Sequence, residues 1–396
     1  MKSSKSAREP MPRPLCPHAA TLLFATAVVS LAWGAGVVRG DVAAGQTSGS
    51  DVLVHIAELK GAVAEECSPF SADGARFVTV ENHMGDCTLL VWDTGSWKLH
   101  ARPIRQRAVI TQRLTSNGTG LFTETGDGQV GIWDVETSAL RSVVRVGEPS
   151  FIAKCAPDGS RYFTRDSRDV ANLQLWRPGD TKPFVVLEHS DGVTFAAFDA
   201  ASARIVTREW AKGAAIHLWD AKTGLPSCAP IETDFIDMAD DRQVAAFDAS
   251  GKRLVFARRA GFSVADTITG KILARGDTKD GAETHAIRLS GDGSTVAVLT
   301  DNKWPGEERP IQIFESATGK FIRSAARSTI FCELSATGRW LFCGIDRNST
   351  EVWDLSNGLK VQTVPNSLGV IALSPNGRTL AISHDSETSI WRVRDK

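Results

Sequence analysis

The stretch IHLWDAKTGLP, residues 216–226, decides the fold because close copies of it recur along the chain. It ends an apolar run on a tryptophan and an aspartate and continues into Lys-Thr-Gly. A search for internal repeats therefore comes before any search for an active site. Two degenerate copies carry Ala265 and Phe314 at the tryptophan position. The other six copies contain Trp92, Trp133, Trp176, Trp219, Trp353 and Trp391.

The spacing of these copies is that of a propeller blade. Subtracting successive residue numbers gives 41, 43, 43, 46, 49, 39 and 38 residues. Repeats of roughly 40–45 residues, each too small to bury its own apolar face, are typical of four-stranded propeller blades. The repeat length therefore favours a radial array of small sheets.

A hairpin turn precedes every copy, as in CAPDGSRYF (155–163) and LSPNGRTLA (373–381). Asp-Gly and Asn-Gly supply the positive φ that a tight turn between antiparallel strands requires. The fourth copy, FDAASARIV, has lost the turn glycine, but the residues four before and three after the glycine position are apolar or aromatic in all eight copies. Before the turn they are Phe70, Leu114, Cys155, Phe198, Phe247, Leu289, Leu334 and Leu373, and after it Phe77, Leu121, Tyr162, Ile205, Leu254, Val296, Leu341 and Leu380.

Each repeat therefore predicts two strands joined by this turn and a third strand that ends on the tryptophan. An Asp-x-x-Thr-Gly type turn then leads into a fourth strand. We expect an all-β protein, a single β-propeller of eight four-stranded blades, with seven blades as the alternative. The chain stops five residues after Trp391, and DVLVHIAELK (51–60) reads as a strand without preceding partners. We expect residues 51–60 to complete the last blade and remove its open edge.

The repeats resemble those of the WD-repeat propeller family over essentially all of residues 51–396, with the Trp-Asp pair at 92–93, 133–134, 219–220 and 353–354. The resemblance implies a binding platform, usually for other proteins, and usually no catalysis. It also implies a buried tetrad of histidine, serine or threonine, aspartate and tryptophan in each blade.

The sequence departs from that tetrad in every repeat. His189, Thr207 and Trp219 fit in the fourth repeat, where the turn aspartate is missing. Thr123, Asp127 and Trp133 fit in the second repeat, where Arg105 stands in place of the histidine. We expect the stabilisation of the tetrad to be absent or replaced.

The segment before the repeats differs from them in composition. Lys2, Lys5, Arg8 and Arg13 precede residues 19–38, which carry no charge. This pattern is typical of a secretory signal peptide, with an uncleaved membrane anchor as the alternative. We therefore divide the chain into residues 1–44 as signal or anchor, 45–50 as linker and 51–396 as propeller, and we expect a periplasmic or extracellular protein. The net charge of −1 predicts no bulk attraction to nucleic acid.

The sequence offers no catalytic, cofactor or metal motif. The eight histidines show no H-x-H or H-E-x-x-H spacing, and neither a Walker A nor a G-x-S-x-G pattern occurs. We expect no cofactor. The prediction is a non-catalytic protein-interaction scaffold. The alternative is a propeller enzyme, a lactone hydrolase or quinone-dependent oxidoreductase, with its site in the central channel. A polysaccharide-binding surface protein is a third hypothesis.

Candidate partner-binding residues lie where the repeats differ, because loops on a rigid scaffold usually carry binding. HARPIRQR and TRDSRDV form a basic sector and IETDFIDMADD an acidic one, on connections expected to open on one face. Solvated loops without a function are the competing interpretation. Trp210 and Trp304 lie outside the repeat register. Each of them either anchors a partner or packs over its own blade. The candidates are Arg102, Arg105, Arg107, Arg165, Arg168, Trp210, Asp234, Asp237, Asp240 and Trp304, with Glu232 and Asp241 in the same acidic stretch.

Cys332 and Cys343 flank the SATG turn symmetrically, so they should lie opposite or diagonal on neighbouring strands. In an exported protein this pair is the best candidate for a disulfide. The geometry of adjacent strands disfavours the bond. On the sequence alone, a disulfide and two free thiols both remain alternatives.

Overall fold

The computed structural model describes residues 51–394, except 64–67, 146–152, 167–168, 211–214, 235–242, 301–309, 328–331, 346–348, 366, 368–370 and 385. The chain divides into two units, Met1–Thr47 and Ser48–Lys396, and all described residues belong to the second. No helix among them is long and apolar enough to cross a membrane. The expected signal or anchor, including residues 19–38, lies outside the described residues.

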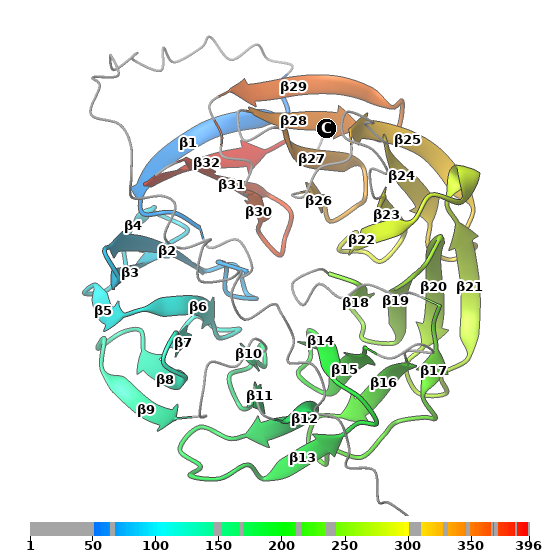
Figure 1. Ribbon diagram of the computed structural model, residues 1–396. Coiled ribbons are helices and arrows are strands. Elements are labelled where there is room, and N and C mark those ends of the chain that lie inside the picture. Colours follow the sequence, from blue (N-terminus) through cyan, green and yellow to red (C-terminus); the bar gives the residue numbers. More distant parts are fainter. Residues whose placement is uncertain are drawn as a thin grey trace, which may run out of the picture. The chain divides into compact units, whose positions relative to one another are not determined.

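The second unit is a β-propeller of eight four-stranded sheets arranged in a ring, as predicted (Figure 1). We number the blades along the chain. Blades one to four contain β2 (Arg76–His83), β3 (Asp86–Asp93), β4 (Lys98–Leu99) and β5 (Ile104–Arg107); β6 (Val109–Leu114), β7 (Gly120–Thr125), β8 (Gln129–Asp134) and β9 (Leu140–Arg145); β10 (Ala153–Cys155), β11 (Tyr162–Asp166), β12 (Asp169–Trp176) and β13 (Val185–Glu188); and β14 (Val193–Phe198), β15 (Arg204–Glu209), β16 (Ala215–Asp220) and β17 (Ile231–Glu232).

Blades five to eight follow the same antiparallel order from the centre outward. They contain β18 (Ala245–Phe247), β19 (Arg253–Arg258), β20 (Gly261–Asp266) and β21 (Ile272–Asp277); β22 (Thr284–Leu289), β23 (Thr295–Thr300), β24 (Pro310–Glu315) and β25 (Phe321–Arg327); β26 (Cys332–Leu334), β27 (Trp340–Ile345), β28 (Ser349–Asp354) and β29 (Leu359–Pro365); and β30 (Ile371–Leu373), β31 (Thr379–His384), β32 (Glu387–Val393) and β1 (Leu53–Lys60). A short 3-10 helix, η3 (Lys279–Gly281), precedes β22.

The apolar residues on each side of the first turn and the residue at the tryptophan position form one row of side chains across each blade. In blade four, Phe198 lies opposite Ile205, and Ile205 lies opposite Trp219. Directly opposed residues project from the same face of a sheet. All eight blades repeat this register, although the first pair of blade one, Phe70 and Phe77, is an isolated bridge. The apolar positions of the repeat are therefore the packing surface between blades.

The turns follow the expected chemistry. The turn residue between the first two strands has a positive φ of 58–72° in every blade, including Ser202, which replaces glycine in blade four. In the later turn, one Asp220 oxygen accepts hydrogen bonds from the backbone N–H groups of Lys222 and Thr223 at 3.1 and 2.8 Å. Gly224 completes this turn with φ +71°.

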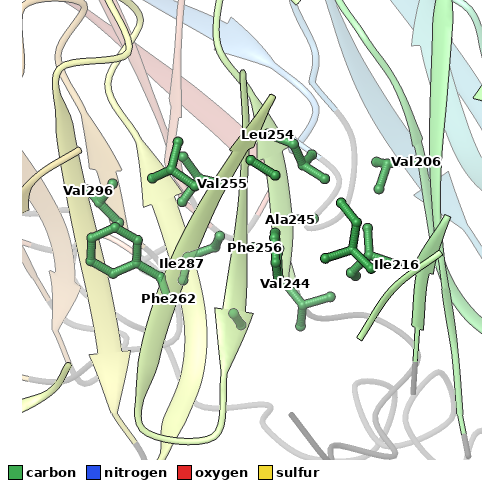
Figure 2. Close-up of a cluster of buried hydrophobic side chains, with 14 of the residues drawn as sticks. Val206, Ile216, Val244, Ala245, Leu254, Val255, Phe256, Phe262, Ile287 and Val296 are labelled. Atoms are coloured by element: carbon green, nitrogen blue, oxygen red, sulfur yellow. The ribbon is translucent and has the colours of Figure 1, made fainter. Parts of the chain in front are cut away.

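The core runs continuously from one blade to the next. In Figure 2, Phe256 of blade five lies among Val206 and Ile216 of blade four and Ile287 of blade six. These side chains are buried. Because each sheet has two neighbours, both of its faces are covered, which explains why strands such as β7 and β23 are buried along their whole length.

Blade one and blade eight differ from the others at their edges. The outer position of blade one is divided between β4 and β5, which both pair with β3. In blade eight the outer strand is β1, which pairs antiparallel with β32 (Figure 1). The contribution of this pairing to the stability of the ring is a prediction.

Cys332 and Cys343 face each other in register on β26 and β27, and both thiols are free. Burial raises the pKa of the Cys332 thiol to about 12 and that of the Cys343 thiol well above its usual value. Thiols in this state are poor nucleophiles. In the structure the pair packs as two small apolar side chains.

Candidate interaction surface

The tryptophans of the repeat donate hydrogen bonds within their own blades. In blades one to four the indole Nε1–H donates to a threonine hydroxyl on the second strand at 2.9–3.0 Å, and the acceptors are Thr79, Thr123, Thr164 and Thr207. In blades seven and eight the acceptor is instead Glu351 or Ser389, two residues before the tryptophan. Blades five and six lack both groups, since Ala265 and Phe314 replace the tryptophan and Phe256 and Val298 the threonine. The Trp-Asp pair therefore has a structural role.

Blade four contains part of the predicted tetrad. The Thr207 hydroxyl accepts the hydrogen bond from Trp219 and lies 2.7 Å from His189 Nε2, to which it donates. His189 Nδ1 lies 3.0 Å from the carbonyl oxygens of Ala171 and Leu187, so this nitrogen carries the proton. These two carbonyl groups thus accept the hydrogen bond of His189 in blade four, where the aspartate is missing.

Blade two has three of the four residue types of the tetrad, with Arg105 in place of the histidine. Thr123 accepts from Trp133, but Asp127 accepts from Thr125 and Gln129. Arg105 lies on β5 of blade one, opposite Thr88. Asp127 therefore accepts hydrogen bonds within its own hairpin.

The low pKa of His189 predicts that the stability of the fold depends on pH. Burial, with a further contribution from His217, lowers the pKa of His189 to about 4 from 6.5. A histidine held neutral contributes fully above about pH 6.5, and this contribution is lost as the pH falls towards 4. Between pH 7 and 5 we expect the wild-type free energy of unfolding to fall by about 1–2 kcal/mol from this group.

The His189→Gln variant should lose this part of the pH dependence, because glutamine does not titrate. Urea denaturation at pH 7, 6 and 5 measures the slope, and His83→Gln, at an exposed position, is the matched control. An unchanged slope in His189→Gln would show that another group causes the acid sensitivity.

The predicted basic sector divides into exposed and buried members. The expected loop is partly a strand, because Ile104 is buried and β5 pairs with β3. Arg102 and Arg105 are exposed, and Arg107 is 86% exposed and pairs with Asp86. Arg165 is 5% exposed on β11, not on a loop, and donates to the carbonyl oxygen of Val193 in blade four. Arg165 therefore joins two blades, and Arg168 lies outside the described residues.

Only the start of the acidic sector is described. Glu232 ends β17, and the exposed Asp234 accepts from the backbone N–H of Arg259 at 3.1 Å. The Arg258 guanidinium lies 3.8 Å from Asp234. Asp237, Asp240, Asp241 and Trp304 lie outside the described residues.

Trp210 lies on the exposed surface beside the junction of blades three and four. It is 38% exposed, and its backbone N–H donates to the Gly192 carbonyl at 2.8 Å. A Cβ added to Gly192 would lie 3.4 Å from Val170 and 3.8 Å from Trp210, so both side chains flank this glycine. Val170 is also exposed. Sequence reasoning missed Val170, because only the fold brings β12 next to this loop.

The innermost strands carry four charged residues at one repeat position, directly before the paired apolar residue. They are Arg113, Lys154, Arg288 and Glu333. Lys154 Nζ lies 5.1 Å from the centre of the Phe195 ring in the next blade, and Arg288 donates to the Cys332 carbonyl at 3.0 Å. Burial raises the pKa of Glu333, and Arg288 opposes this effect. The described residues contain no group of three or more histidine, cysteine, aspartate or glutamate side chains placed to hold a metal ion.

Comparison with known proteins identifies the fold. No protein-family model and no curated protein sequence matches the chain. Among solved structures, the β-propeller domain of Cps50 (Swd1) from Myceliophteria thermophila is 17% identical, with a TM-score of 0.51 over 72% of this chain and 97% of that one. The C-terminal WD40 domain of Sif2 is 14% identical, with a TM-score of 0.62 over 87% of this chain and 99% of that one. The chain thus has the fold of WD40 propellers.

Proposed function

We propose that this chain is a non-catalytic protein-interaction scaffold displayed outside the cytoplasm. Polar groups shared by the repeats form hydrogen bonds inside their own blades, as between the tryptophan and the threonine of blades one and four. Recognition must therefore use what the repeats do not share. The resemblance to WD repeats supports a binding platform for proteins.

The observation that carries this proposal is the position of Val170 and Trp210, which both border Gly192. Both side chains are exposed, and they come from different blades. Aromatic side chains at a rigid surface bury a large area at small entropic cost and are frequent anchors of interfaces. Arg105 and Arg107, exposed on β5, supply charge that can steer a partner.

Affinity purification from envelope fractions, with Trp210→Ala and Arg105→Glu/Arg107→Glu variants, tests the proposal. We expect Trp210→Ala to reduce the recovered partner at least about fivefold, and the charge reversal to weaken capture and its salt dependence. Leu273→Ala, on the outer strand β21, and Lys271→Glu, at a turn of blade five, are matched exposed controls. Equal recovery with all four variants would refute this surface.

Display outside the cytoplasm is supported by the basic residues and the uncharged residues 19–38. Fractionation of cells that express the full chain tests it. Recovery in the periplasm, medium or membrane agrees with export, and recovery only with cytoplasmic markers contradicts it.

A further inference from the structure

The outer position of blade one ends in a short strand with an open edge. β5 begins at Ile104, and its register with β3 is regular as far as Arg107. Within the part of the chain that the structure describes, no strand pairs with the other edge of β5. An open edge presents peptide N–H and C=O groups to which a further strand can bind.

The outer strands of the other blades are less suited to a further strand or carry a different charge. Those of blades two, five, six, seven and eight contain a bulge in their pairing, which disturbs the edge. In blade four, β17 has only two residues. In blade three, β13 is regular over four residues, but its exposed charged residue is Glu188. β5 therefore combines a regular outer edge with exposed positive charge.

The peptide groups of the two arginines of β5 point towards the open edge. The Ala108 N–H donates to the Gly85 carbonyl at 2.7 Å, and these residues continue the register of Arg107 with Asp86. In an antiparallel ladder, hydrogen-bonded pairs alternate with pairs that are not hydrogen-bonded. Arg107 and Arg105 lie one and three residues before Ala108, so they belong to the second kind. Their N–H and C=O groups face away from β3.

The side chains of these arginines lie together on one face of β5. Arg105 and Arg107 are exposed, whereas Ile104 is buried on the opposite face. Residues two apart in a strand project from the same face. Arg107 lies 3.1 Å from Asp86, but both side chains are largely exposed to water, so this ion pair is weak. Two guanidinium groups thus stand beside the outward-facing peptide groups.

The carboxylates of this face lie further from the open edge than the arginines do. Asp86 is on β3 and Glu81 is on β2. A strand added outside β5 would lie about 10 Å from β3 and about 14 Å from β2, because neighbouring strands are about 4.8 Å apart. These distances exceed the screening length of about 8 Å at physiological salt. The charge that meets an added strand is therefore that of Arg105 and Arg107.

We propose that β5 binds an extended acidic segment of a partner protein as an added strand. This inference rests on the scaffold function proposed above and names the chemistry of the partner at one contact. The outward peptide groups of Arg105 and Arg107 supply two N–H donors and two C=O acceptors to the added strand. Acidic side chains at alternate positions of the segment project from one face and meet the two guanidinium groups.

Fluorescence anisotropy measures the binding of the fluorescein-labelled peptide Val-Glu-Val-Glu-Val-Glu to the full chain, beside Val-Lys-Val-Lys-Val-Lys. We expect the acidic peptide to bind at least about tenfold more tightly than the basic one. The Arg105→Glu/Arg107→Glu variant should bind the acidic peptide at least about tenfold more weakly than the wild type. Lys271→Glu/Arg275→Glu, at exposed positions of blade five, is the matched control that should leave binding unchanged. Thermal melting of each variant verifies folding.

Two N-methylated isomers of the acidic peptide separate strand addition from attraction between charges alone. One isomer carries methyl groups on the glutamate nitrogens and the other on the valine nitrogens. Because the N–H groups of alternate residues face opposite edges of a strand, only one of these sets can bond to β5. We expect one isomer to bind at least about tenfold more weakly and the other to bind like the unmethylated peptide. Equal binding of the two isomers, no binding to the wild type, or unchanged binding to Arg105→Glu/Arg107→Glu would each overturn the inference.

The two proposals fail separately, because this titration needs no partner. Capture of a partner without binding of the acidic peptide would reject the added strand and leave the scaffold standing. Peptide binding without any captured partner would reject the scaffold alone.

Discussion

Removal of residues 51–60 should lower the thermal midpoint of the full chain by more than about 10 °C. These residues contain β1, which buries Leu53 and Leu59 and pairs with β32 along most of its length. Each buried leucine is worth about 2–5 kcal/mol. Differential scanning calorimetry of the purified protein measures the midpoint.

The expected effect is large because β1 contacts more than its own blade. Leu53 packs in one cluster with Phe342 of blade seven, and its backbone exchanges two hydrogen bonds with the Gln362 amide, at 2.8 and 3.1 Å. Leu59 packs with Phe77 of blade one. Deletion therefore exposes the edge of β32 and loosens blade eight from both neighbours.

Point variants separate this mechanism from a mere shortening of the chain. Leu53→Ala/Leu59→Ala should reproduce about half of the deletion's effect, whereas Glu58→Ala/Lys60→Ala, at exposed positions of the same strand, should shift the midpoint by no more than about 2 °C. A deletion mutant that melts within a few degrees of the wild type would refute the closure of the ring by β1.

The fold was predictable because its determinants are local and repeated. The apolar residues on each side of the turn, such as Leu114 and Leu121, must face each other once the turn has formed. Eight repetitions of that pair also set the blade count. The split outer strand of blade one was not predictable, because β5 buries only Ile104 and offers no clear alternation.

The candidate site was harder to predict because exposure depends on contacts between blades. Arg165 was grouped with a loop by its charge, although its repeat position is that of the buried Ala257 and Leu299. Counting residues from the first turn would have placed Arg165 at this buried position. The position of Val170 beside Gly192 depends on how blades three and four pack together, which no local pattern encodes.

Replacement of Thr207 by valine should destabilise the fold by about 2–5 kcal/mol. The hydroxyl is fully buried and serves two partners, accepting from Trp219 at 2.9 Å and donating to His189 at 2.7 Å. Valine has nearly the same shape, so the loss comes from two buried polar groups left without a partner. Thr164→Val in blade three is the control, because Thr164 accepts from Trp176 without a corresponding histidine bond, and we expect about 1–3 kcal/mol there.

The double variant Thr207→Val/Trp219→Phe isolates the indole part of this effect. It installs in blade four the pair that blade six carries naturally as Val298 and Phe314. Phenylalanine has no N–H to leave unsatisfied, so the double variant should be at least about 1 kcal/mol more stable than the sum of the two single losses predicts. Urea denaturation of all four proteins measures the coupling. Strict additivity would show that the Trp219–Thr207 bond contributes nothing, and the stretch IHLWDAKTGLP would then act through packing alone.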